Sequence, residues 1–288
     1  MGDDNYTSFS IENSTENEHG MKIKFIKHVT TCTIISIGLP LTLVTIYALY
    51  SLVRKDHVAP IYVINLLITD LFQLCCLIVL ESGIFGYVKR IYGCLLLTSV
   101  GFMVCVSLER YLVIAHPLWY RFRRTIKISV AVCVVVWVIP PVLLFTVDQL
   151  VRNAVWGLIG AEFILSLFFM TPFPLFIFFL VGTLRALSAS VSVSSDEKRR
   201  IVGILVLVLL IYTFLFLPAI ICLLVDEGRL NNNFTILAVM SYRLSPLADL
   251  SLYIFIRKDI VGKFLSAVCC CKMESNDNDE PAVNVDDI

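Results

Sequence analysis

Charge is scarce in this chain. Only 16% of its 288 residues are Asp, Glu, Lys or Arg, whereas about 25% is typical of soluble domains. The 23 basic and 23 acidic residues cancel, which argues against the basic face of a nucleic-acid-binding protein. The ten Cys are scattered, mostly within apolar runs, so the chain is not a small disulfide scaffold. Because it also lacks a metal-ligand cluster, a phosphate loop and a nucleophile–base arrangement, we expect no enzymatic activity.

Apolar residues, in contrast, make up 58% of the chain. They form seven runs, each long enough to cross a hydrocarbon core of about 30 Å. The runs are continuous, which excludes the alternating strands of a membrane β-barrel. We therefore predict an all-α membrane protein, a seven-transmembrane helix bundle. Its expected spans are residues 29–53, 59–82, 85–111, 126–147, 155–187, 201–225 and 234–256.

The distribution of basic residues predicts the orientation of the bundle. With the N-terminus outside, most of the 23 Lys and Arg residues fall on the inner side. The glycosylation sequons at Asn5, Asn13 and Asn233 then all lie outside. Residues 1–28 contain no apolar stretch that would act as a signal peptide. We predict that they form a glycosylated extracellular N-terminus, followed by the bundle at residues 29–256.

The segment after the seventh span is expected to lie on the inner leaflet. Apolar residues recur at helical spacing between residues 256 and 265, which predicts a short amphipathic eighth helix. Cys269, Cys270 and Cys271 follow and are candidates for palmitoylation; the alternative is three unmodified thiols. Residues 257–271 are thus predicted to be a membrane-surface helix with a Cys cluster. Residues 272–288 read as a disordered, acidic cytoplasmic tail.

A short motif at the inner end of the third span suggests a family. Glu109-Arg110-Tyr111 stands there, and Pro117-Leu118 follows. This pattern resembles the signature of rhodopsin-like (class A) G-protein-coupled receptors.

Residues in the other spans agree with the resemblance, which covers about residues 29–271. The end of the seventh span is similar to the proton-sensing and nucleotide-type receptors, and the nearest branch is the proton-sensing, lysolipid and nucleotide group. The residues that carry the likeness outside the third span are Asp70, Trp137, Pro140, Pro141, Pro172, Phe216, Pro218, Asp249 and Tyr253.

The resemblance implies a plasma-membrane receptor that transduces an extracellular signal into activation of a heterotrimeric G protein. It implies an activation switch and, through Arg110 and Leu118, contacts with the G protein. The residues of the implied switch are Glu109, Arg110, Tyr111, Phe216, Pro218 and Tyr253.

Several positions depart from the family pattern. Thr42, Leu180 and Leu250 replace residues that the family usually has, and they leave open a divergent, non-signalling receptor that acts as a decoy or partner. The disulfide that pins the third span to the second outer loop is also missing, because Phe85 stands at its first position and residues 148–156 contain no Cys. A seven-span transporter is a more distant alternative, since no inverted repeat is visible.

Charged residues inside a span are functional hypotheses by default. The resemblance implies that Asp70, Ser99 and Asp249 line an allosteric Na⁺ pocket, with Thr42 and Ser245 as further polar groups. The alternative is a hydrogen-bonded polar cluster without an ion. A third hypothesis is acid sensing, because a fall in pH would protonate two carboxylates that repel each other. His residues are too scarce to make acid sensing by a His cluster a good prediction.

Basic residues near the outer ends of two spans are candidates for ligand binding. Lys89 and Arg90 lie at the start of the third span, and Arg243 lies outward of Asp249 on the seventh. Such a set suits the phosphate or carboxylate of an anionic lysolipid or a nucleotide-like ligand. The alternative for Arg243 is internal pairing with Glu81 at the end of the second span.

Overall fold

The structure is a computed structural model, and it describes residues 4–53, 61–83, 86–116, 126–153, 157–189, 195–225 and 232–256, with side chains from residue 21 onward except at some helix ends. The described segments are helical and contain no strand, so the predicted all-α fold class is confirmed. The predicted surface helix, Cys269, Cys270, Cys271 and the tail belong to a separate unit, residues 257–288, which lies outside the described residues. The helices are α1 (Asp4–Val53), α2 (Ile61–Glu81), α3 (Gly86–Ala115), α5 (Ile126–Asn153), α6 (Gly157–Met170), α7 (Pro172–Ala189), α8 (Ser195–Leu224), α9 (Asn232–Arg243) and α10 (Ser245–Ile256).

Six stretches in the described part of the chain are long and apolar enough to cross a membrane. The first, Met21–Leu49, lies within α1 and includes most of the predicted span 29–53. The fifth crosses a helix break at Thr171, which precedes Pro172. The six stretches are Met21–Leu49, Ile61–Glu81, Gly86–Ala115, Lys127–Arg152, Phe163–Ser188 and Ile201–Leu224.

The predicted seventh span forms two 12-residue helices, α9 and α10, instead of one. The break lies at Leu244, whose N–H donates to the carbonyls of Met240 and Ser241. Pro246 follows, and it has no N–H with which to continue the helical hydrogen bonds. Because Leu244 O still accepts from Ala248 N at 3.0 Å, helical bonding resumes after the break. The 25 residues from α9 to α10 are long enough to cross a bilayer, at about 37 Å if fully helical.

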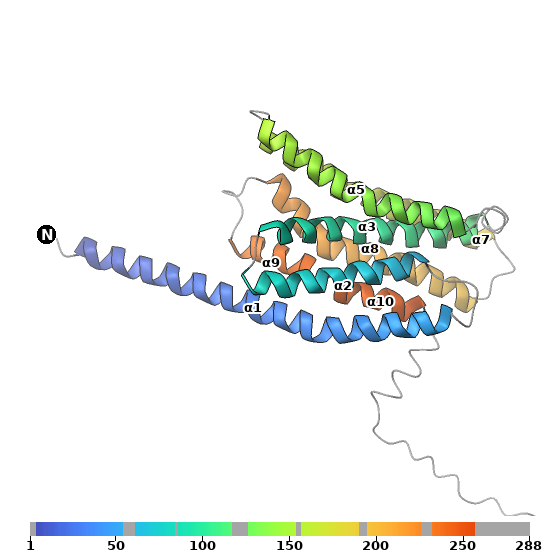
Figure 1. The fold of residues 1–288 in the computed structure, drawn as a ribbon, viewed down its shortest axis with the longest axis horizontal. Coiled ribbons are helices and arrows are strands. Elements are labelled where there is room, and N and C mark those ends of the chain that lie inside the picture. The colour runs from blue at the N-terminus through green and yellow to red at the C-terminus, as the bar shows by residue number, and fades with distance from the viewer. Residues whose placement is uncertain are drawn as a thin grey trace, which may run out of the picture. The chain divides into compact units, whose positions relative to one another are not determined.

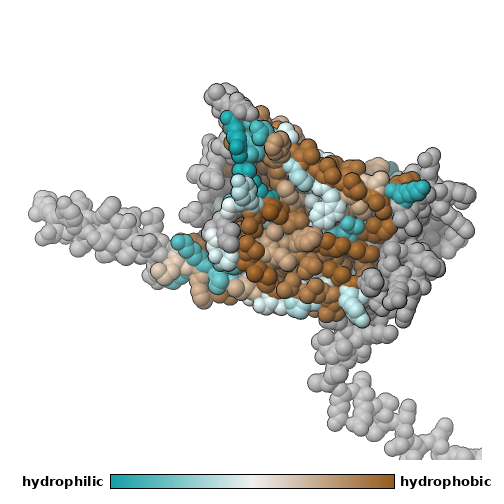
Figure 2. All heavy atoms as spheres, viewed as in Figure 1, coloured by the Kyte–Doolittle hydropathy of each residue, from teal (hydrophilic) through white to brown (hydrophobic). Residues whose placement is uncertain are grey.

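α3 is the central helix of the bundle. Of its most apolar stretch, 67% is buried, against 17% for α5. α2 and α3 lie between α1 and α5 (Figure 1). α5 turns Val138, Val142 and Phe145 outward, each more than half exposed. Hydrophobic side chains cover the middle of the visible face (Figure 2), as expected where lipid rather than water surrounds the helices.

Candidate functional site

Asp249 of α10 lies in a buried polar cluster. Its Oδ2 accepts hydrogen bonds from Ser99 Oγ at 3.0 Å and Ser245 Oγ at 3.4 Å. Asp70 of α2 lies close enough to interact electrostatically with Asp249. All four side chains are at most 1% exposed. The structure thus brings together, from three helices, the four residues that the sequence placed in one cluster.

This cluster has more acceptors than donors. Both carboxylate oxygens of Asp70 and Oδ1 of Asp249 lack a hydrogen-bond partner within the described residues. Thr42 Oγ1 on α1 is likewise buried without one. An ionised carboxylate removed from water is strongly unfavourable unless its charge is offset. Carboxylate and hydroxyl oxygens suit a hard cation, so these side chains fit Na⁺; a proton bound by the pair would also reduce the charge.

Glu109 and Arg110 lie at the inner end of α3 under the predicted orientation. Glu109 is 6% exposed. Arg110 is partly buried, and its Nε has no hydrogen-bond partner in the part of the chain that is described. The predicted G-protein contact Leu118 lies outside the described residues. The guanidinium of Arg110 therefore has unused donor capacity at the end of the central helix.

Tyr111 packs against α7 beside this arginine. Its ring centroid lies 5.7 Å from that of Phe178 and 5.8 Å from that of Phe179. Gly182 makes the close approach possible, because a Cβ at that position would lie 2.6 Å from Tyr111 Cε2. The last residue of the motif thus joins α3 to α7.

The predicted switch residue Phe216 is buried in α8. Its ring stacks on Tyr212, with centroids 5.2 Å apart, and on Phe169, with centroids 6.0 Å apart. The Tyr212 hydroxyl donates to the backbone carbonyl of Phe169, which joins α8 to the end of α6. Pro218 lies within α8 toward its C-terminal end, and Tyr253 of α10 is 3% exposed.

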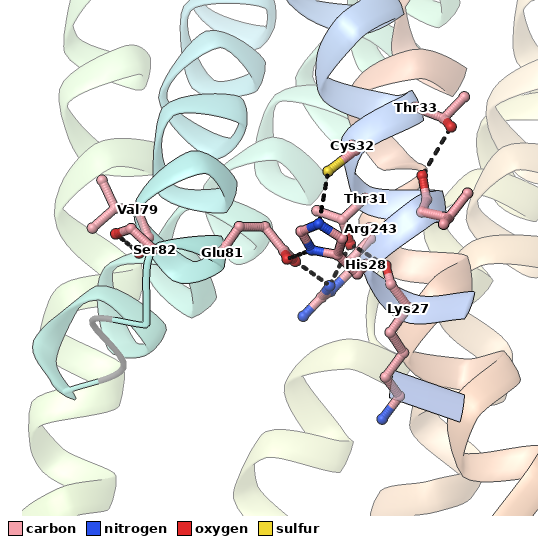
Figure 3. A network of polar contacts seen from close by, with 10 residues as sticks. Lys27, His28, Thr31, Cys32, Thr33, Val79, Glu81, Ser82 and Arg243 are labelled. Carbon is pink, nitrogen blue, oxygen red and sulfur yellow. Dashed lines mark hydrogen bonds and ion pairs between the residues drawn. The ribbon is translucent and has the colours of Figure 1, made fainter. Parts of the chain in front are cut away.

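Arg243 has partners inside the protein. Its Nη1 lies 3.6 Å from Glu81 Oε1 and donates to Thr31 Oγ1 at 2.6 Å. The other oxygen of Glu81 lies 2.6 Å from Nδ1 of His28, whose Nε2 lies 3.7 Å from Cys32 Sγ. Side chains of α1, α2 and α9 converge here (Figure 3). Pairing of Arg243 with Glu81 is the internal alternative considered from the sequence, whereas His28 and Thr31 were not anticipated as partners.

Lys89 and Arg90 have different surroundings. Arg90 Nη2 lies 3.1 Å from Asp148 Oδ1 on α5, and Asp148 Oδ2 lies 2.8 Å from Arg152 Nη2. Lys89 is exposed and has no ion-pair partner among the described residues. It helps to line an open hollow of about 410 Å³ between α3 and α5. The structure therefore divides the predicted ligand set into an Arg243–Glu81 pair and a Lys89–Arg90 pair.

One polar link was missed at the sequence level. Trp137 Nε1 donates to Asn65 Oδ1 at 3.0 Å, and Asn65 Nδ2 donates to the Ile61 carbonyl at 2.9 Å. The Trp137 ring also meets Phe72 and Phe102 edge to face. An Asn and a Trp inside two apolar runs were the available signal, because a buried polar atom needs a partner.

Of the predicted glycosylation sites, only Asn233 has a described side chain. Asn233 is exposed at the start of α9, whereas the side chains of Asn5 and Asn13 lie outside the described residues. Across the described ranges no three His, Cys, Asp or Glu residues gather as for a metal ion. The cysteines in these ranges are free: Cys32, Cys75, Cys76, Cys94, Cys105, Cys133 and Cys222.

Comparison with known proteins supports the resemblance drawn from the motifs. Residues 41–155 match the family described as 7 transmembrane receptor (rhodopsin family). Human G-protein coupled receptor 68 is 32% identical over 121 residues, which cover 38% of this chain and 33% of that receptor. A purinoceptor of Gallus gallus is 25% identical over 80% of this chain and 76% of the relative. Proteinase-activated receptor 1 of Xenopus laevis is 23% identical, over 87% of this chain and 68% of the relative.

The helical bundle, its apolar spans and these matches define a multi-pass membrane protein of the receptor class. Over residues 41–155 the chain resembles the rhodopsin-like family of G-protein-coupled receptors, and the relatives that it matches include a nucleotide-type purinoceptor. This is a family of receptors and not of enzymes. The alignment spans about a third of the length of the human and mouse G-protein coupled receptor 68.

Proposed function

We propose that this protein is a plasma-membrane receptor that converts binding of an extracellular signal into nucleotide exchange on a heterotrimeric G protein. The observation that carries the proposal is Arg110, a partly buried guanidinium with an unpaired Nε at the end of the central helix. The neighbouring Tyr111 fixes the end of α3 against α7, and the Arg110 guanidinium is available to a partner that docks between the inner helix ends. Leu118, eight residues further on, is the proposed apolar contact with the same partner.

The central cluster is the proposed switch between two helix packings. Asp70, Ser99 and Asp249 come from α2, α3 and α10, so a cation among them favours one spacing of these helices. A ligand that favours another spacing shifts the population away from the cation-bound state. When bound, Na⁺ would supply positive charge to carboxylate oxygens that otherwise lack a partner. Phe216, Pro218 and Tyr253 are proposed to transmit the rearrangement along α8 and α10.

The outward-facing charges suggest the class of signal. Glu81 with Arg243, and Lys89 with Arg90, lie near the proposed outer helix ends. Protons or an anionic ligand with a phosphate or carboxylate group would alter the Arg243–Glu81 and Arg90–Asp148 ion pairs. The names of the relatives include a purinoceptor and a proteinase-activated receptor, so the family allows ligands of very different chemistry.

The organisation proposed from the sequence follows from this role. Residues 1–28 are outside, with glycans on Asn5, Asn13 and Asn233. Residues 257–271 lie on the inner leaflet, with palmitoylation at Cys269, Cys270 or Cys271, and residues 272–288 form the cytoplasmic tail. The positive-inside distribution of Lys and Arg supports this orientation.

The test is G-protein activation in cells that express the parent, Arg110→Ala or Arg185→Ala at matched surface levels. Arg185 lies near the end of α7 and has no ion-pair partner within the described segments, so its variant controls for loss of one basic residue. The outer pH is stepped from about 8 to 6. We expect activity in the parent and in Arg185→Ala, and its loss in Arg110→Ala. Activity that survives equally in Arg110→Ala would contradict the proposal.

A further inference from the structure

The hollow between α3 and α5 is built from two facing stripes of side chains. Its α3 wall comes from residues 86, 89, 90 and 93, and its α5 wall from residues 144, 147, 148 and 151. Both sets follow the spacing of one helical face. Gly86 and Gly93 leave space on the α3 side, since a Cβ on Gly86 would meet nothing within 4 Å and one on Gly93 would lie 3.6 Å from Leu144 Cδ1.

The chemistry of this hollow changes along its length. Lys89, Arg90 and Asp148 lie near the ends of the two spans, whereas Gly93 and Leu144 lie about one turn deeper. Val147 lines the apolar side and is 8% exposed. In Figure 2, hydrophilic side chains gather at the corresponding end of the bundle and hydrophobic ones cover its middle. Polar groups at a span end above an apolar wall match the order of headgroup and acyl chain in one leaflet.

The charged side chains at the polar end of the hollow favour binding of an anion. Asp148 is shared by Arg90 and Arg152, so its single negative charge meets two positive ones. Lys89 adds a positive charge that no described carboxylate offsets. The four side chains therefore present a net positive charge to the headgroup region. Lys and Arg side chains donate charge-assisted hydrogen bonds to phosphate oxygens, so these charges suit an anionic headgroup.

We propose that this hollow binds an anionic phospholipid from the surrounding leaflet, with its phosphate on Lys89 and Arg90 and one acyl chain along Gly93, Leu144 and Val147. The volume of about 410 Å³ lies within the usual range for ligand pockets and accommodates a headgroup with the first part of a chain. The site lies between two helices and shares no lining residue with the Asp70–Asp249 cluster. It requires no coupling to a G protein.

The test is lipid retention by the purified full chain, measured by native mass spectrometry after equilibration with dioleoyl phosphatidate or dioleoyl phosphatidylcholine. We expect the parent to retain the phosphatidate in preference to the phosphatidylcholine. Lys89→Gln should weaken phosphatidate binding about fivefold, because the phosphate loses one charge-assisted contact. Lys24→Gln, which removes an exposed lysine from α1, is the matched control and should leave retention unchanged.

A second pair of variants tests the apolar part of the site. Gly93→Ala adds a Cβ at ordinary contact distance from Leu144 and should retain the lipid. Gly93→Phe fills the hollow and should abolish specific retention, with thermal stability measured in parallel to show that the variant is folded. If Gly93→Phe does not fold, the comparison of Lys89→Gln with Lys24→Gln tests the proposal by itself. Equal loss in these two lysine variants, or equal retention of both lipids by the parent, would overturn the proposal.

Discussion

Replacing Asp70 by Asn should abolish a dependence of thermal stability on Na⁺. In the parent, Asp70 and Asp249 are buried and interact, and the described residues supply no hydrogen bond to either oxygen of Asp70. Asn has nearly the same shape as Asp but carries no charge. The Asp249 carboxylate then keeps its two hydroxyl donors, Ser99 and Ser245, and no longer faces a second carboxylate.

The expected magnitude follows from ligand linkage. A cation present at ten times its dissociation constant stabilises the folded state by about 1.4 kcal/mol, and at 100 times by about 2.7 kcal/mol. For a chain of this length, 1 kcal/mol corresponds to a shift in Tm of about 2–4 °C. Replacing N-methylglucamine by Na⁺, at ten times the dissociation constant of Na⁺, should therefore raise the Tm of the parent by about 3–6 °C. The Tm of Asp70→Asn should not change.

The assay is thermal unfolding of the purified chain in detergent, with Na⁺ or N-methylglucamine as the cation at constant ionic strength. Asp148→Asn is the matched control, because it makes the same chemical change in a partly exposed ion pair. It should respond to Na⁺ as the parent does. A parent whose Tm is the same in both cations would refute the sodium interpretation. If that Tm instead varied with pH, and Asp70→Asn removed the variation, a proton would be the compensating charge.

Two further predictions concern packing between helices. Gly182→Ala should lower the free energy of unfolding by about 1–3 kcal/mol, because its Cβ would displace the Tyr111 ring. Gly203→Ala is the control: a Cβ there meets nothing within 4 Å, so the variant should be neutral or slightly stabilising. Equal Tm values for the two variants would contradict this reasoning. Asn65→Leu should lower the free energy of unfolding by about 1–3 kcal/mol and shift the Trp fluorescence, because the Trp137 N–H loses its acceptor. An unchanged Tm would show that this hydrogen bond does not stabilise the fold.

The helices could be predicted from sequence because membrane insertion depends on local properties. An apolar run of about 20 residues is enough to define a span, whatever it packs against. The break at Leu244 was missed, although Pro246 signals it, because the seventh span was predicted from its overall length and apolar content. Hydropathy indicates that a segment can cross the membrane, but it does not indicate where a proline removes a backbone N–H donor and interrupts the helix.

Contacts between helices depend on how each helix is rotated and tilted, which an apolar run specifies poorly. Resemblance to a family was enough to place Asp70, Ser99 and Asp249 together. Neither the Asn65–Trp137 contact nor the Arg90–Asp148 contact was predicted from the sequence, and the structure shows both. Lys89 and Arg243 were grouped because both lie near the outer end of a span. Equal depth in the membrane does not show which way each side chain faces, so the grouping had the same weakness.

At the proposed outer end of the bundle, an ion pair lies near the place where the family has a disulfide. The family's disulfide would anchor the start of the third span, and a bridge of that kind typically stabilises by about 2–4 kcal/mol. Here the Arg90–Asp148 ion pair joins α3 to α5 in the same region, with an Arg90 side chain that is 57% exposed. Exposed ion pairs contribute about 0–1 kcal/mol and weaken as salt rises. The ends of α3 and α5 are therefore held less firmly than a disulfide would hold them, and the hollow lies between these ends, where a lipid could separate the helices at low cost.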